Sequence, residues 1–178
     1  MESGNRLWLV AAAAAMWMAS APTLAQDDER CFGCHDDPEL TGFRGDEEIP
    51  MYIDPQVVAA SSHADLACVE CHEDLAGSRR RRHAEDLEPV DCGACHRSAA
   101  REERASLHGM AQAAGDPMAP RCADCHGKHD ILSSGNPAAP TAVMNIPMLC
   151  GTCHKEGSPV TETHEIAQDH ILEHYSMS

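Results

Sequence analysis

The sequence predicts a mainly α-helical chain with much irregular structure and little or no sheet, wrapped around something other than a polypeptide core. Only four aromatic residues follow the first twenty positions, and much of the 43% hydrophobic content is alanine. A chain of 178 residues with this composition cannot bury enough apolar surface to offset its ordering entropy. Ten cysteines, in contrast, recur in a regular pattern. The net charge of −16 argues against a nucleic-acid partner.

The first 25 residues have the pattern of a signal peptide. Arg6 supplies a positive charge, residues 7–19 form a short apolar stretch, and small residues precede a cleavage point between Ala25 and Gln26. An uncleaved signal anchor is the alternative, although the apolar stretch is short for a membrane span. We therefore expect a periplasmic protein, and an extracellular or outer-membrane-associated location stays open.

All ten cysteines fall into five copies of the pentapeptide Cys-x-x-Cys-His. This pattern is the attachment signature of c-type haem, in which two thiols bond to the porphyrin and the next histidine reaches the iron from one side. Zinc sites, redox motifs or five disulfides would not require a histidine after every second cysteine. We therefore expect five covalent haem c groups. The expected thioether residues are Cys31, Cys34, Cys68, Cys71, Cys92, Cys95, Cys122, Cys125, Cys150 and Cys153, and the expected proximal iron ligands are His35, His72, His96, His126 and His154.

Five porphyrins would supply the apolar surface that the chain lacks. The first cysteines of successive motifs are 37, 24, 30 and 28 residues apart, which predicts a string of haems with variable connectors and argues against a strict solenoid. Residues 133–140, which contain one glycine and two prolines, are expected to form a linker between the fourth and fifth haems.

The sequence resembles the multihaem cytochromes c, the large group built from repeated Cys-x-x-Cys-His units with bis-histidine haems. The resemblance covers residues 31–154 and includes the segments 61–63 (Ser-Ser-His), 106–109 (Ser-Leu-His-Gly) and 125–130 (Cys-His-Gly-Lys-His-Asp). Such segments occur in periplasmic and extracellular electron-transfer cytochromes, where the additional histidine is a distal iron ligand. The resemblance therefore implies that His63, His108 and His129 are distal ligands.

Seven histidines remain for the second axial position of five irons. The distal candidates are His63, His108, His129, His83, His164, His170 and His174. His129 follows the fourth motif by only three residues, so we expect it to ligate a neighbouring haem rather than the opposite face of the same iron. Methionine is the competing ligand type, and the available methionines are Met51, Met110, Met118, Met144 and Met148.

Two helices are expected beside these ligands. Asp54 is the predicted N-cap of a helix over residues 55–63, because proline occupies the first helical position. Ser98 is the predicted N-cap of a second helix, which runs to His108 and ends at Gly109.

The predicted organisation is a signal peptide (1–25), a pentahaem domain (26–160) and a C-terminal amphipathic tail (161–178). Three histidines recur at helical spacing between residues 161 and 175, which fits either a helix docked over a haem or an exposed polar helix. Because the last residues resemble a Ser-x-His segment cut short, two further expectations are a truncated chain or a tail that docks on a partner.

The function expected from this pattern is electron relay in an anaerobic respiratory chain, by low-potential bis-histidine haems. The partners would be redox proteins, such as a quinol-oxidising membrane cytochrome or a terminal reductase, with an oligomer or filament as a further form. The alternative is a multihaem reductase of a small nitrogen or sulfur oxyanion, which needs one iron with an open site. All five motifs are intact and no substrate cradle of Lys, Tyr and Arg is visible, so we expect no catalytic residues.

Overall fold

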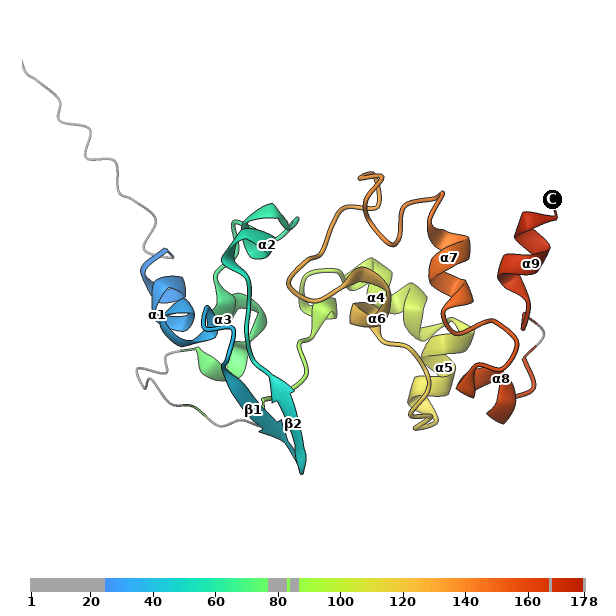
Figure 1. Ribbon diagram of the computed structural model, residues 1–178, viewed down its shortest axis with the longest axis horizontal. Helices are drawn as coiled ribbons and strands as arrows, with labels where there is room; N and C mark the ends of the chain where they lie inside the picture. The colour runs from blue at the N-terminus through green and yellow to red at the C-terminus, as the bar shows by residue number, and fades with distance from the viewer. Residues whose placement is uncertain (1–24, 77–82, 84–86, 167, 178) are drawn as a thin grey trace, which may run out of the picture.

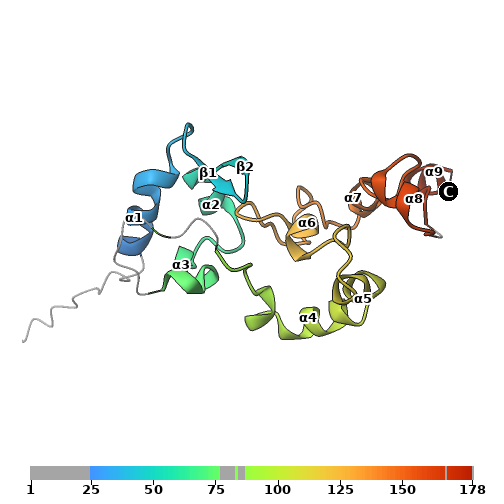
Figure 2. The same ribbon diagram turned by 90° about the horizontal axis from the view of Figure 1, so that it is seen from below.

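The computed structural model describes residues 25–76, 83, 87–166 and 168–177. The predicted fold class is confirmed, because short helices and irregular connections surround one small sheet. The chain extends from α1 at one end of the long axis to α9 at the other (Figure 1, Figure 2). Its elements in order are α1 (Ala25–His35), β1 (Thr41–Arg44), β2 (Glu47–Pro50), α2 (Pro55–Ala60), α3 (Cys68–Cys71), η1 (Glu73–Leu75), η2 (Cys92–Ala94), α4 (Arg97–Arg104), α5 (Leu107–Ala113), α6 (Cys122–His126), α7 (Ile146–Gly151), α8 (Pro159–Thr163) and α9 (Ile171–Ser176).

One predicted feature falls outside this description. Residues 1–24 of the expected signal peptide are not among the described residues. None of the described helices is long and apolar enough to cross a membrane.

The polypeptide buries almost no side chains by itself. Among the described residues, the buried apolar ones are Ala67, Ala139 and Ala142. Larger apolar side chains remain exposed to solvent, such as those of Leu107 (76% exposed) and Met144 (74% exposed). Three alanines supply far less apolar burial than a chain of this length needs. The scarcity of core residues in the sequence therefore corresponds to a real absence of a core in the described part of the chain.

The first predicted helix starts where expected but ends early. The Asp54 side chain accepts a hydrogen bond from the Gln56 backbone N–H at 2.8 Å, which confirms the N-cap. The helix stops at Ala60 and not at residue 63, because Ser61 is extended and its hydroxyl accepts the backbone N–H of His63. His63 therefore lies on a turn that leaves the helix.

The second predicted helix is wrong in its bounds. The structure has two helices here, α4 and α5, because Ser106 adopts an extended backbone and caps α5 by accepting the Gly109 N–H at 3.1 Å. Gly109 lies inside α5 rather than at a helix end. A Cβ at Gly109 would come 2.2 Å from the carbonyl oxygen of Glu103, so this glycine lets α4 and α5 approach closely. His108 is thus placed by the second helix of a packed pair.

The prediction of a single helix in the tail is also wrong. Its chain segment forms α8 and α9, and α8 ends where His164 adopts an extended backbone; the described residues between the two helices, 164–166 and 168–170, are not helical. This stretch is held by two contacts, one from His164 to Asp116 and one from the backbone of Gln168 to His154. Helix α9 packs on α7 through Gly151, where a Cβ would come 2.4 Å from Leu172.

The sheet is a hairpin of four residue pairs between α1 and α2. Thr41 pairs with Pro50 and Arg44 pairs with Glu47 in antiparallel register. Gly45 has a φ of 61° at the first position of the two-residue turn, a conformation that favours glycine. The predicted absence of a large sheet is confirmed.

Candidate haem sites

The five motifs occupy short helical turns that follow one another along the molecule. The first lies in the last turn of α1, the second in α3, the third in η2, the fourth in α6, and the fifth at the end of α7. One helical turn brings the two cysteines of a motif to the same side, because residues three apart are neighbours on a helix. None of the ten cysteines is joined in a disulfide. Among the described residues, no group of three or more His, Cys, Asp or Glu side chains is arranged to hold a metal ion.

Four of the five motif histidines face a second histidine. Two imidazoles bound to one iron from opposite sides have ring centroids about 6.3 Å apart, since each metal–nitrogen bond is about 2 Å and each nitrogen lies about 1.15 Å from its ring centre. The observed separations therefore suit a shared iron. The pairs are His35 with His83 at 6.1 Å, His72 with His129 at 6.3 Å, His96 with His63 at 5.9 Å, and His154 with His108 at 6.0 Å.

Backbone carbonyls orient two of the motif histidines. The Met51 carbonyl oxygen lies 2.8 Å from Nδ1 of His35, and the Gln168 carbonyl oxygen lies 2.7 Å from Nδ1 of His154. When Nδ1 donates its hydrogen to a carbonyl, Nε2 keeps the lone pair that binds a metal. Sequence reasoning missed both carbonyls, since a backbone acceptor leaves no signal in residue identity.

Burial also favours the ligating form of one pair. Burial lowers the pKa of both His72 and His129, which favours the neutral form of both rings. Neutral imidazole is the form that binds iron. The structure places His129 beside the second motif and not beside His126 of its own segment.

The cysteines of each motif neighbour those of the next motif. Burial is the largest of the causes that raise the pKa of the Cys68 thiol to about 12, and the nearby Asp28 and Cys31 contribute to the same shift. Burial likewise raises the pKa of Cys71, with Cys95 as the next contributor. The same holds along the rest of the chain. Burial is the largest cause that raises the pKa of Cys92 and of Cys125, and the next contributors are Cys122 and Cys150, respectively. The five motifs therefore lie in space in the order of the sequence.

The three tail histidines are placed elsewhere. Nε2 of His164 lies 3.0 Å from Asp116, and Nδ1 of His170 lies 2.9 Å from Asp169. The hydrogen bond that the His170 ring donates to the Asp169 carboxylate raises the pKa of His170. The rings of His170 and His174 are 6.2 Å apart, a separation explained by their four-residue spacing along one helix. These contacts join His164 and His170 to carboxylates, and the ring of His170 also contacts that of His174.

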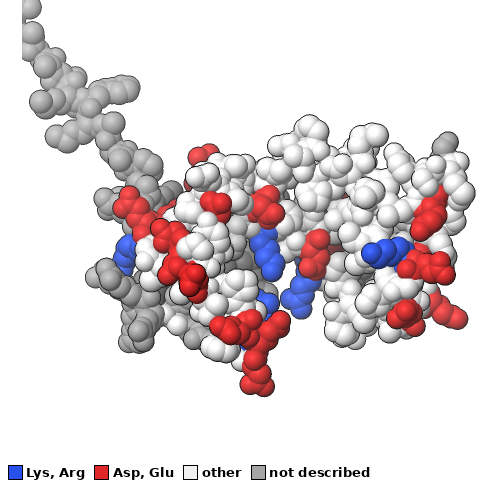
Figure 3. Space-filling view, viewed as in Figure 1, with Lys and Arg blue, Asp and Glu red and all other residues white. Residues whose placement is uncertain are grey.

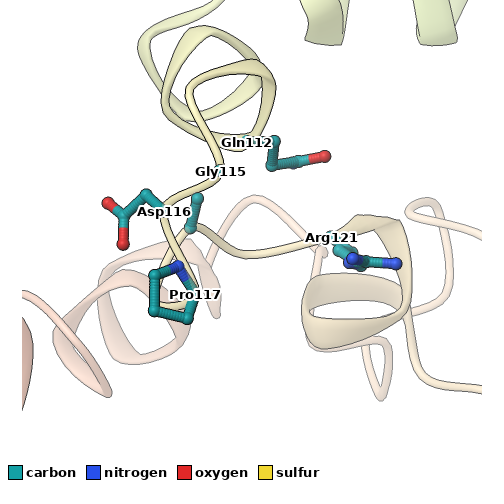
Figure 4. Close-up of a pocket in the computed structure, with 6 residues that line it drawn as sticks. Gln112, Gly115, Asp116, Pro117 and Arg121 are labelled. Atoms are coloured by element: carbon teal, nitrogen blue, oxygen red, sulfur yellow. The ribbon is translucent and has the colours of Figure 1, made fainter.

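A small cavity of about 150 Å³ lies between α5 and α6, just before the fourth motif. Its lining includes Gln112, Asp116 and Arg121, and Figure 4 shows the Asp116 carboxylate pointing away from Arg121. The cavity is too small for a porphyrin, so it is not one of the haem sites.

Repeated thiol pairs, each followed by a histidine and mostly faced by a second histidine, define a multihaem c-type cytochrome. The family profile of cytochrome c3 matches residues 60–155, more than half of the chain. The protein therefore belongs to the cytochrome c3 family, whose members carry several covalent haem c groups and transfer electrons with redox protein partners. The match includes the second to fifth motifs, and the first motif lies before it. Comparisons with curated proteins and with solved structures give no significant match.

Proposed function

We propose that this protein is an exported, periplasmic pentahaem cytochrome that relays electrons along its length in an anaerobic respiratory chain. The observation that carries the proposal is the chain-order succession of the motifs, in which the cysteines of each motif neighbour those of the next. A linear succession favours transfer from one end of the molecule to the other. When bound, each haem iron supplies the reversible change of oxidation state that such a relay uses.

The side chains divide the work of holding five haems. The ten motif cysteines form the thioether bonds, and the five motif histidines bind from one side. From the other side we assign His83 to the first haem, His129 to the second, His63 to the third and His108 to the fifth, on the ring separations of the four pairs.

Each assigned distal histidine comes from a chain segment that belongs to another motif. His63 precedes the second motif but faces the third, and His129 follows the fourth but faces the second. The backbone N–H of Ser62 also donates to the Ile131 carbonyl at 2.7 Å, so these two segments are joined directly. Such crossing ligands hold neighbouring haems at fixed positions, which suits a relay.

The surface indicates the chemistry of the partners. Figure 3 shows acidic side chains gathered at the β1–β2 hairpin and around α8. Glu47, Glu48, Glu162 and Glu165 are exposed in these regions. Negative patches steer partners that carry Lys and Arg around their own redox centre. We propose such basic faces on the electron donor and acceptor, a membrane quinol-oxidising cytochrome or a terminal reductase.

Haem count is the first test. Intact mass and a pyridine haemochrome assay on protein matured in the periplasm should give five haems and cleavage after Ala25. A count of four, with the first motif unmodified, would contradict the pentahaem assignment.

The order of transfer is the second test. The variant C92A/C95A lacks the third attachment site and should keep four haems that are reduced by a docked protein donor in two separate phases. Dithionite, which reaches every site directly, is the control and should reduce all four together. A single fast phase with the protein donor would contradict relay in chain order.

A further inference from the structure

The second motif begins at a helix end that its neighbouring residues cap only in part. Ala67 is the N-cap of α3, and an alanine side chain offers no oxygen to the first backbone N–H groups of a helix. The Glu70 carboxylate accepts the N–H of Ala67 itself at 2.7 Å. Ala67 is only 1% exposed, so an acceptor from the chain matters more for the next N–H, that of Cys68, than at a solvated helix end.

Asp28 supplies this acceptor from 40 residues away. The backbone N–H of Cys68 donates to Oδ1 of Asp28 at 2.9 Å, in a partly buried contact. Helix α1, which carries Asp28, contacts α3, and the two helices lie side by side in both views (Figure 1, Figure 2). A carboxylate makes a stronger acceptor for such a bond than a neutral oxygen does. The first helix therefore caps the first turn of the second motif.

The same face of α1 carries an attachment residue of the first motif. Asp28 and Cys31 are three residues apart, so they are neighbours on one side of the helix. Both lie beside Cys68, since after burial, the largest cause, they are the groups that raise the pKa of its thiol. One helix face therefore spans the junction between the first and second haem sites.

The third motif shows what a local cap looks like. Asp91 directly precedes Cys92, and its side chain accepts the backbone N–H of Gly93 at 2.8 Å. A cap from an adjacent residue fixes the start of one motif. A cap delivered by another motif's helix also fixes the position of one motif relative to the other.

Helix α1 is held at its other end as well. The backbone N–H of Ile53 donates to the carbonyl oxygen of His35 at 2.6 Å, and the Met51 carbonyl oxygen lies 2.8 Å from Nδ1 of His35. The helix is thus attached to the segment after the hairpin at its C-terminus and to the second motif through Asp28. Because both ends are attached, α1 can transmit a fixed geometry between the two sites.

The contact also places a carboxylate beside an attachment residue of the second haem site. Ferric haem carries one more positive charge than ferrous haem, so a fixed negative charge nearby favours the ferric state. The bound haem then has a lower reduction potential. A neutral hydrogen-bond acceptor at the same position would cap α3 without this effect.

We propose that Asp28 is a positioning residue of the second haem site. Its carboxylate holds the first turn of the second motif against α1, which fixes the second haem relative to the first, and its charge lowers the reduction potential of the second haem. This inference rests on the five-haem function proposed above. It assigns to Asp28 a role in joining residues 25–59, which precede the family match, to the matched part of the chain.

The charge is tested by D28N, which keeps an oxygen that can accept the Cys68 N–H. H129A marks the second haem as the one that changes spin state. On the H129A background, D28N should raise the reduction potential of that haem and leave the melting temperature unchanged. E29Q is the matched control, because it removes the same charge from the exposed neighbouring residue of α1, and it should shift this potential much less. No shift in D28N, or equal shifts in D28N and E29Q, would overturn the proposal.

The hydrogen bond is tested by D28A, which removes the acceptor together with the charge. In reduced protein that is otherwise wild type, the amide N–H of Cys68 should exchange with solvent about tenfold faster in D28A, as expected for one lost hydrogen bond. Its exchange should stay slow in D28N, and only D28A should lower the melting temperature. Nuclear magnetic resonance measures the exchange. An equal exchange rate of Cys68 in wild type and D28A would overturn the proposal.

The haem count separates this inference from the function on which it rests. Intact mass should show five haems in wild type, D28N and D28A, because every motif cysteine is kept. Five haems with no effect of D28A would overturn the role of Asp28 and leave the proposed relay intact. Four haems in wild type would contradict the pentahaem relay itself.

Discussion

The second and fourth motifs share one pentapeptide pattern but differ in what surrounds their histidines. His72 faces the ring of His129, and burial lowers the pKa of both. His126 is exposed at the end of α6 and forms no such pair with any of the other eleven histidines, all of which the structure describes. The pentapeptide therefore specifies attachment and one axial ligand, whereas the second ligand depends on which distant segment the fold delivers.

The largest effect is expected when no haem is attached, because the second and fourth motifs then no longer differ. Protein made without haem attachment should be unfolded, because its described part buries only three apolar residues. A thermal scan by circular dichroism should show no cooperative transition, and amide resonances should be poorly dispersed. A cooperative transition in the apo form would show that the chain has a core of its own.

Substitution of His129 should make the second motif resemble the fourth. H129A should convert one haem to high spin and shift its reduction potential, since the iron bound by His72 loses its second imidazole. H164A is the matched control and should change neither. Optical and electron paramagnetic resonance spectra with a potentiometric titration check this, and an unaltered spin state in H129A would remove His129 from the ligand set.

A smaller effect is expected at the junction that places His108. G109A adds a Cβ 2.2 Å from the Glu103 carbonyl oxygen and should cost about 1–3 kcal/mol of stability by forcing α4 and α5 apart. The spectrum of the fifth haem should change with it. G135A is the control, because a Cβ there meets only the Ser133 hydroxyl at an ordinary 3.7 Å. Equal melting temperatures for the two variants would contradict the close-approach argument.

The smallest effect concerns the tail. The hydrogen bond that the His170 ring donates to the Asp169 carboxylate raises the pKa of His170 above its ordinary value of 6.5. This contact therefore stabilises the fold below the ordinary pKa and is lost as the pH rises through the raised value. Ring resonances of His170 should titrate above the ordinary value in wild type and return to it in D169N. A ring that does not titrate would indicate that His170 is an iron ligand.

Local signals predicted one helix start correctly and missed other bounds, among them the N-cap predicted at Ser98, which lies inside α4 behind the actual N-cap His96. Asp54 followed by proline predicts the start of α2 correctly, because a cap depends on adjacent residues. The expected helix from Ser98 to His108 was wrong because Ser106 caps a new helix, α5, in which Gly109 packs closely against the end of α4. The tail helix was wrong because His164 and the Gln168 carbonyl are held by partners 48 and 14 residues away. The helical spacing of the tail histidines gives no indication of these two partners, Asp116 and His154.

The sequence by itself determined the class of protein, because the haem attachment chemistry requires two thiols and a histidine at fixed spacing. It also determined that the chain lacks a core, since composition limits the apolar surface available for burial. Only the tertiary structure decided which histidine faces which motif and in which order the motifs follow one another. Those pairings join residues up to 57 positions apart, as between His72 and His129, and spacing along the chain carries no information about such contacts.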